Sequence, residues 1–207
     1  MIVEKNKLNC AANNLKNGNL IIYPTDTLYG LGADATNTSA IKKINQLKKR
    51  ELPLSIMIAD IKNIHEYAEC DKDIIIKLNE ILPGPFTVLL KAKKSNLSHL
   101  VQNGSDKIGI RIPNHNFCLN LLTKYKKPII TTSVNIHGHE NLNTIEEIQK
   151  IFPEIDIYEE KIKKESKGST IIDFTLNTPK IVRKGDGDFF EWKYLNEYYH
   201  TQNHTKY

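Results

Sequence analysis

Arginine is rare in this 207-residue chain: of its 29 basic residues, only Arg50, Arg111 and Arg183 are arginines. The planar guanidinium group binds phosphate or carboxylate through two parallel hydrogen bonds and stays charged, which the ammonium group of a flexible lysine cannot reproduce. Each arginine also stands near a proline or a glycine in a short, distinctive segment. The three residues therefore predict a binding site for an anionic ligand. The alternative is that they are ordinary surface residues.

The strongest local pattern is residues 23–32, Tyr-Pro-Thr-Asp-Thr-Leu-Tyr-Gly-Leu-Gly, which follow the apolar run 20–22. A proline ends the strand, two threonine hydroxyls and a carboxylate follow it, and two glycines let the backbone approach another group closely. This pattern predicts a strand that ends in a binding loop. A plain turn, the alternative, needs neither the paired hydroxyls nor both glycines.

Residues 128–138 are a second candidate segment, in which an apolar strand ends in hydroxyls, an amide and a glycine. Sheet edges commonly present such groups to small ligands. Ser133 lacks the glycines that flank the nucleophile of serine hydrolases, which argues against covalent catalysis. His137 and His139 form an HxH pair, but no matched carboxylate or cysteine lies nearby, so a mobile loop is favoured over a metal site. The sequence has no Walker A or GxGxxG pattern, so any nucleotide must be bound differently.

The composition is ordinary for a soluble globular protein, with 40% hydrophobic and 26% charged residues. No stretch approaches the roughly 20 apolar residues of a membrane span, and the N-terminus lacks the apolar run of a signal peptide. Cys10, Cys70 and Cys118 are widely spaced and form no CxxC pattern, which argues against a disulfide framework or a cysteine zinc site. We therefore expect a cytoplasmic protein that does not enter a membrane.

The net charge of +5 is modest, and lysines cluster at residues 91–94 and 124–127. These clusters could contact nucleic-acid phosphates, but the chain also carries 24 acidic residues, and solvated loop or helix ends are the commoner explanation. Weak direct binding of RNA therefore stays open as an alternative.

Short β-branched runs alternate with longer segments of helical period, which predicts an α/β domain with a mixed sheet and surrounding helices. The expected strands are residues 20–23, 54–59, 86–92, 107–112, 128–133, 169–174 and 180–183. The expected helices are residues 8–16, 39–49, 61–68, 72–82, 116–126 and 144–152. Residues 1–188 would form the domain, and the aromatic residues 189–207 a tail or docking helix.

Three helix starts carry a polar residue of the kind that caps a helix. Asn37 or Thr38 precedes the second expected helix, and Asp71 precedes the fourth. Asn143 is followed three residues later by Glu146, which resembles a capping box at the start of the last helix.

Taken together, seven segments resemble the YrdC-like domain of threonylcarbamoyl-AMP synthases. They occur in the order of that family: residues 23–32, Lys48-Lys49-Arg50, Pro83-Gly84-Pro85-Phe86-Thr87, Ile110-Arg111-Ile112-Pro113, Ser133-Val134-Asn135, Gly168-Ser169-Thr170-Ile171-Ile172-Asp173 and Val182-Arg183-Lys184-Gly185. The combination of KxR with SxN is a hallmark of the family.

The resemblance implies a twisted mixed sheet with helices around a basic concave surface. It also implies an enzyme that joins L-threonine, bicarbonate and ATP, with Mg²⁺, into threonylcarbamoyl-AMP and releases pyrophosphate. The product feeds the threonylcarbamoyladenosine modification of tRNA, so the implied partners are the transferase proteins of that modification.

The resemblance also implies roles for individual residues. Four would bind threonine, with the arginine on its carboxylate: Thr27, Arg111, Ser133 and Ser169. Four would bind ATP: Lys48, Arg50, Asn135 and Arg183. Of these, Lys48 would lie close to the phosphates, and Lys48 and Arg50 would be the catalytic residues.

The chain departs from the family pattern in places. The loop after Arg50 is about two residues shorter than in relatives, and Met57 stands where some relatives have a histidine near the threonine. The chain ends soon after Arg183, which predicts the short, single-domain form. The alternative function is that of a YrdC-like paralogue that binds nucleotide or structured RNA without making the adenylate.

Overall fold

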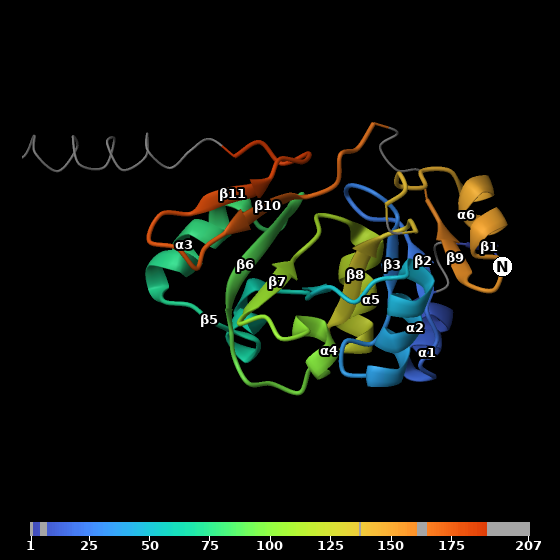
Figure 1. The fold of residues 1–207 in the computed structure, drawn as a ribbon, viewed down its shortest axis with the longest axis horizontal. Helices are drawn as coiled ribbons and strands as arrows, with labels where there is room; N and C mark the ends of the chain where they lie inside the picture. Colours follow the sequence, from blue (N-terminus) through green and yellow to red (C-terminus); the bar gives the residue numbers. More distant parts are fainter. Residues whose placement is uncertain (1, 5–7, 137, 161–164, 190–207) are drawn as a thin grey trace, which may run out of the picture.

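The computed structural model describes residues 2–4, 8–136, 138–160 and 165–189 (Figure 1). In these residues, one mixed sheet of 11 strands runs through the length of the molecule. Its strands are β1 (Ile2–Glu4), β2 (Ile21–Tyr23), β3 (Gly30–Gly32), β4 (Ser55–Met57), β5 (Ala68–Glu69), β6 (Phe86–Ala92), β7 (Lys107–Arg111), β8 (Ile129–Ser133), β9 (Asp156–Glu159), β10 (Thr170–Asp173) and β11 (Lys180–Arg183).

The strand order is β1-β9-β2-β3-β8-β4-β7-β6-β10-β11, with β5 paired to β6. Four pairs are parallel, namely β1 with β9, β9 with β2, β4 with β7 and β6 with β10. The other pairs are antiparallel. This confirms the predicted α/β class with a mixed sheet. Strand β8 lies in the middle, where Ser133 pairs with Gly30 of β3 and Thr131 pairs with Ser55 of β4.

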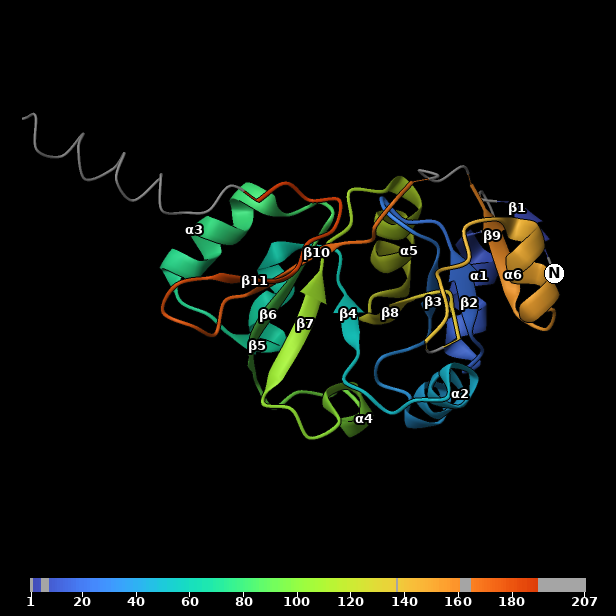
Figure 2. The same ribbon diagram turned by 45° about the horizontal axis from the view of Figure 1, so that its top comes forward.

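Helices pack on both sides of this sheet (Figure 2). They are α1 (Leu8–Lys16), α2 (Thr38–Lys48), the 3₁₀ helix η1 (Ile61–Glu66), α3 (Lys72–Ile81), α4 (His99–Gln102), α5 (Asn116–Tyr125) and α6 (Ile145–Ile151). No helix among the described residues is long and apolar enough to cross a membrane.

One face of the sheet is apolar along most of its length. Ile22, Ile56, Ile110 and Ile130 have no exposed surface there and pack with buried residues of α2, α3, α4 and α6. Burying such a side chain fully stabilises the fold by roughly 1.5–3 kcal/mol. This face is the main hydrophobic core.

The second face is divided between core and polar surface. Helices α1 and α5 cover one part, where they pack on Tyr23, Met57 and Ile129. Because side chains alternate along a strand, the residues two positions away from Met57 and Ile129 lie on this same face, and these are Ser55 and Thr131. The polar residues of the sheet therefore collect beside the smaller core.

The glycines of β3 make room for Tyr23. A Cβ atom at Gly30 would lie 2.9 Å from the Tyr23 ring, and one at Gly32 would lie 2.6 Å from it. Both distances are too short for a real side chain. The two glycines were predicted to allow a close approach of the backbone to another group, and that group is the Tyr23 ring of the same chain.

Most predicted elements are confirmed within two residues, and β6, β11 and α1 have the predicted bounds. The helix predicted at 61–68 is shorter: it is the 3₁₀ helix η1, and residues 68–69 form β5 on the edge of β6. The sequence prediction missed β1, β3, β5, β9 and α4, all of four residues or fewer. Such short elements carry too few residues to show a period.

Two of the predicted caps are confirmed. Asn37 Oδ1 accepts a hydrogen bond from Ala40 N at 3.1 Å, and Asp71 Oδ1 accepts from Ile74 N at 2.8 Å. The capping box at Asn143 is wrong. The helix begins one residue later, and Thr144 caps it by accepting from Glu147 N at 3.3 Å.

The predicted aromatic tail lies almost wholly outside the described residues. Its first residue, Phe189, packs against the main core. The division into residues 1–188 and 189–207 stays a prediction.

Candidate functional site

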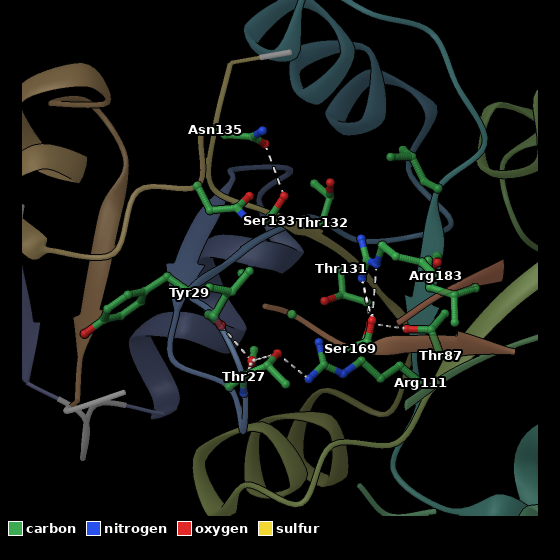
Figure 3. Close-up of a pocket in the computed structure, with 18 of the residues that line it drawn as sticks. Thr27, Tyr29, Thr87, Arg111, Thr131, Thr132, Ser133, Asn135, Ser169 and Arg183 are labelled. Atoms are coloured by element: carbon green, nitrogen blue, oxygen red, sulfur yellow. Dashed lines mark hydrogen bonds between the residues drawn. The ribbon is translucent and has the colours of Figure 1, made fainter. Parts of the chain in front are cut away.

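A cavity of about 480 Å³ opens on the polar part of the second face (Figure 3). Its walls come from the β2–β3 loop, the residues after α2, strands β4, β6, β7 and β8, and the segment around β10 and β11. Hydroxyl side chains dominate the lining: Thr25, Thr27, Ser55, Thr87, Thr131, Thr132, Ser133 and Ser169. Four cations also line it: Arg50, Arg111, Lys167 and Arg183. This donor set suits an anionic ligand with several oxygen atoms.

The β2–β3 loop is stiffened by its own threonines. Thr25 Oγ1 donates to Leu28 O at 2.6 Å and accepts from Thr27 N at 3.1 Å. The hydroxyls of Thr25 and Thr27 lie 3.2 Å apart. The loop therefore holds Thr27 in place without a ligand.

Arg111 is buried at one side of the cavity and is only partly engaged. Its Nη2 donates to Asp26 Oδ1 and to Thr27 Oγ1, the latter at 2.7 Å. Asp26 is fixed in turn, because its Oδ2 accepts from Asn114 N at 3.0 Å. The Nε atom of Arg111 is buried without a hydrogen-bond partner among the described residues. A buried donor without a partner costs about 1–3 kcal/mol, which the two bonds from Nη2 must offset.

Arg183 lies across Ser169 on the neighbouring wall (Figure 3). Its Nη2 donates to Ser169 O at 2.7 Å and to Ser169 Oγ at 3.2 Å. The Ser169 hydroxyl is also 2.8 Å from that of Thr87. Burial and the positive charge of Arg111 lower the pKa of Arg183 below its usual value. The two arginines repel each other, and an anion between them would relieve this repulsion.

Ser133 and Asn135 stand at the end of β8. Ser133 Oγ donates to Asn135 Oδ1 at 3.1 Å, and Asn135 Nδ2 donates to His139 O at 3.0 Å. Arg50 lines the same part of the cavity, and its side chain has no hydrogen bond or ion pair with any described residue. The Arg50 side chain is therefore available to bind a ligand.

Seven of the eight predicted site residues line this one cavity, although they come from distant parts of the sequence. The eighth, Lys48, does not line it. Lys48 is buried, and its Nζ donates to Ser133 O at 2.7 Å, to Asn135 O at 3.3 Å and to Asn135 Oδ1. Burial and the charge of Arg50 lower its pKa to about 8.

Several lining residues were given no role by the sequence prediction, among them Ser55, Thr87 and Thr131. Thr131 lies two residues before Ser133 on the same strand, and strand alternation could have identified it. Ser55 becomes recognisable only through its pairing with Thr131. Thr87 lies in one of the seven segments that resemble the family, but no role was predicted for it.

Met57 does not reach the cavity, because it is fully buried in the smaller core. His139 lines the cavity, but His137 lies outside the described residues. In the part of the chain that is described, no three His, Cys, Asp or Glu side chains gather in a way that could hold a metal ion.

The short loop after Arg50 is anchored at both ends. Asn103 Nδ2 donates to Glu51 O at 2.8 Å, and Leu54 N donates to Val101 O at 2.8 Å. Both partners belong to α4 or follow it directly. The shorter loop is therefore fixed to a neighbouring helix.

The sequence and the fold both resemble known proteins. A family model for Sua5, YciO and YrdC proteins, described as "Telomere recombination", matches residues 13–185. A protein of Methanocaldococcus jannaschii named "Putative threonylcarbamoyl-AMP synthase" is 39% identical over 176 residues, which cover 83% of this chain and 81% of that protein.

Two solved structures have the same fold. Sua5 of Pyrococcus abyssi, crystallised with L-threonine, superimposes with a TM-score of 0.81 at 29% identity, over 89% of this chain and 57% of that one. YciO of Escherichia coli gives a TM-score of 0.80 at 26% identity, over 91% of this chain and 95% of that one. The match to the family model spans well over half of the residues, in the part of the chain that forms the cavity. The chain belongs to the Sua5/YciO/YrdC family.

Proposed function

We propose that this chain is an L-threonylcarbamoyladenylate synthase, which forms threonylcarbamoyl-AMP and pyrophosphate from L-threonine, bicarbonate and ATP. One observation carries the proposal: Arg50, Arg111 and Arg183, the three arginines of the sequence, converge on one hydroxyl-lined cavity. The relative named as such a synthase, and the Sua5 structure with L-threonine, support it.

Threonine would bind at Arg111. The guanidinium group of this residue would donate to the threonine carboxylate, while its Nη2 stays held by Asp26 and Thr27. The remaining predicted contacts, Thr27, Ser133 and Ser169, supply hydroxyl groups around the same space. This side of the cavity suits a small zwitterion with a hydroxyl group.

ATP would bind at Arg50, Asn135 and Arg183. Arg50 has no partner among the described residues, and Arg183 carries a positive charge that burial makes less favourable. Phosphate oxygens would satisfy both groups through charge-assisted hydrogen bonds. Mg²⁺ would accompany the phosphates, because a divalent cation offsets the negative charge of the transferred and leaving groups.

The reaction builds up negative charge in one place, and the fixed cations of the cavity would stabilise it. The threonine amine attacks bicarbonate to give a carbamate and water, and a carbamate oxygen then attacks the α-phosphorus of ATP while pyrophosphate leaves. The arginines would stabilise the transferring adenylyl group and the leaving pyrophosphate. Holding the carbamate beside ATP would replace a slow encounter of unstable species with a reaction inside one site.

The product would serve tRNA modification. In this proposal the chain works in the cytoplasm and passes threonylcarbamoyl-AMP to the transferase proteins that act on tRNA. The lysine clusters would allow at most weak contact with tRNA.

The test is an assay of the purified chain with ATP, Mg²⁺, bicarbonate and L-threonine, in which pyrophosphate release is followed. We expect release that requires threonine and bicarbonate. Release without threonine, or formation of ADP and phosphate, would contradict the proposal. Binding of nucleotide or RNA without any pyrophosphate would instead favour the paralogue without synthase activity. RNA binding through lysines would also weaken steeply with salt and ignore threonine.

A further inference from the structure

We propose that Lys48 is a positioning residue, which ties the turn of Ser133 and Asn135 to the end of α2 and so fixes Asn135 relative to Arg50. The kinetic consequence rests on the proposed synthase function. The contacts themselves do not, because they are made in the protein without substrate.

The surroundings of Lys48 leave it no free donor. Its three Nζ–H groups have three acceptors, namely Ser133 O, Asn135 O and Asn135 Oδ1. The side chain is 1% exposed and does not line the cavity. To contact a phosphate, Lys48 would have to leave backbone acceptors that would then lose a charge-assisted hydrogen bond.

The turn that Lys48 holds has few other fixed points. Asn135 Oδ1 accepts from both Lys48 and Ser133 Oγ, so its amide oxygen is turned towards α2. Beyond it, two backbone bonds close the turn: His139 N to Ile136 O at 3.0 Å and Leu142 N to Val134 O at 2.9 Å.

The other end of the connection is the last turn of α2. Lys49 has φ of 50° and ψ of 39°, a left-handed conformation, and its N–H bonds back to Asn45 O and Gln46 O. The chain therefore changes direction between Lys48 and Arg50. Although they are two residues apart, Lys48 points to β8 and Arg50 lines the cavity. Lys48 thus joins the two segments that would bind ATP.

The first experiment measures amide hydrogen exchange without substrate in the wild-type protein and in Lys48→Met, which keeps a long apolar stem but has no donor. We expect exchange at least several-fold faster at the amides of His139 and Leu142, because the turn loses its anchor. Lys42→Met, at an exposed position of the same helix, is the matched control and should exchange at the wild-type rate. Unchanged exchange in Lys48→Met would overturn the proposal.

A second variant guards against misfolding of the first. Asn135→Ala removes the side-chain acceptor of Lys48 and leaves α2 intact, but it also removes the bond from Asn135 Nδ2 to His139 O. Asn135→Asp loses only that donor and keeps an acceptor for Lys48, so exchange at the two amides should be faster in Asn135→Ala than in Asn135→Asp. Equal exchange in these two variants would mean that the Lys48–Asn135 bond does not hold the turn, and the proposal would be wrong.

The kinetic experiment is a double-mutant cycle on pyrophosphate release. Lys48→Met should reduce kcat/KM for ATP by about tenfold. The double variant Lys48→Met/Asn135→Ala should have the same kcat/KM as the less active of the two single variants. Losses that multiply would instead identify Lys48 as an independent phosphate contact. If the wild-type protein releases no pyrophosphate, the synthase function fails, while the exchange result still decides the role of Lys48.

Discussion

The two sides of the cavity differ in how far they are assembled without substrate. At Arg111, an ion pair with Asp26 and a hydroxyl contact with Thr27 fix the guanidinium group, and a backbone bond from Asn114 fixes Asp26. At Arg50, the backbone is anchored through the neighbouring loop, but the side chain has no partner among the described residues.

This contrast fits the two proposed ligands. A small amino acid offers few contacts, so its binding gains from a site that is already ordered. ATP offers many phosphate oxygens and can order a free arginine by itself. The Arg111 side is therefore preorganised, whereas the Arg50 side depends on its ligand.

The largest effect should come from Arg111→Lys. An ammonium group cannot contact Asp26, Thr27 and a ligand carboxylate in the same plane, so we expect a loss of about 3 kcal/mol, or over a hundredfold, in kcat/KM for threonine. The melting temperature should fall as well, because the ion pair with Asp26 is buried. Steady-state kinetics and thermal denaturation measure the two effects. Wild-type values would refute the preorganised arrangement.

Arg50→Lys should have the next largest effect, and on a different substrate. We expect about 2 kcal/mol in kcat/KM for ATP, roughly 30-fold, because bidentate phosphate binding is lost. The melting temperature should stay at the wild-type value, since the Arg50 side chain has no protein partner to lose in the described structure. A fall in melting temperature as large as that of Arg111→Lys would remove the difference between the two sides.

A smaller effect should follow from Asp26→Asn. The amide keeps an acceptor for Asn114 N but loses the charge that holds Arg111 in place. We expect KM for threonine to rise by about tenfold, or 1.4 kcal/mol, with little change in KM for ATP. Asp60→Asn is the matched control, because Asp60 caps η1 and does not line the cavity. Equal changes in KM for both substrates would show that Asp26 does not act through Arg111.

The smallest effect is a pH dependence of stability due to Lys48. Its pKa is lowered to about 8 in the folded protein, so above that pH the unfolded chain holds a proton that the folded chain has released. Stability rises with pH wherever the unfolded state binds more protons, which here spans about pH 8 to about 10.4. We expect a gain on the order of 1 kcal/mol over the first pH unit of this window.

Urea denaturation of the wild-type protein and of Lys48→Met at several alkaline pH values measures this gain. The difference in unfolding free energy between the two proteins should grow with pH in favour of the wild-type protein. A difference that stays constant with pH would mean that Lys48 keeps its ordinary pKa.

The sequence predicted most of the site because its chemistry is local. The hydroxyls after β2, the end of β8 and the rare arginines each stand out within a few residues, and seven of the eight predicted site residues line one cavity. The rest depended on tertiary contacts. Lys48 lies close to Arg50 in the sequence, and it was predicted to lie near the phosphates as well. The left-handed conformation of Lys49 instead directs the two side chains to different places.

The same division holds for the fold. Long periodic segments such as β6 and α5 were predicted closely, since burial on one side leaves a clear pattern. Strand β3 was missed because Gly-Leu-Gly has low strand propensity on its own. It pairs between β2 and β8, and its two glycines leave the space that the Tyr23 ring occupies.

The buried ammonium of Lys48 also sets a limit on how this protein can change. Burial disfavours its charge, but an apolar replacement would leave Ser133 O and Asn135 O without this donor. Its three acceptors belong to a turn of the candidate site, so selection for activity would oppose that change. On the role proposed for Lys48, relatives that carry out the reaction should keep a lysine here, and assays of relatives with an apolar residue at this position would test that expectation.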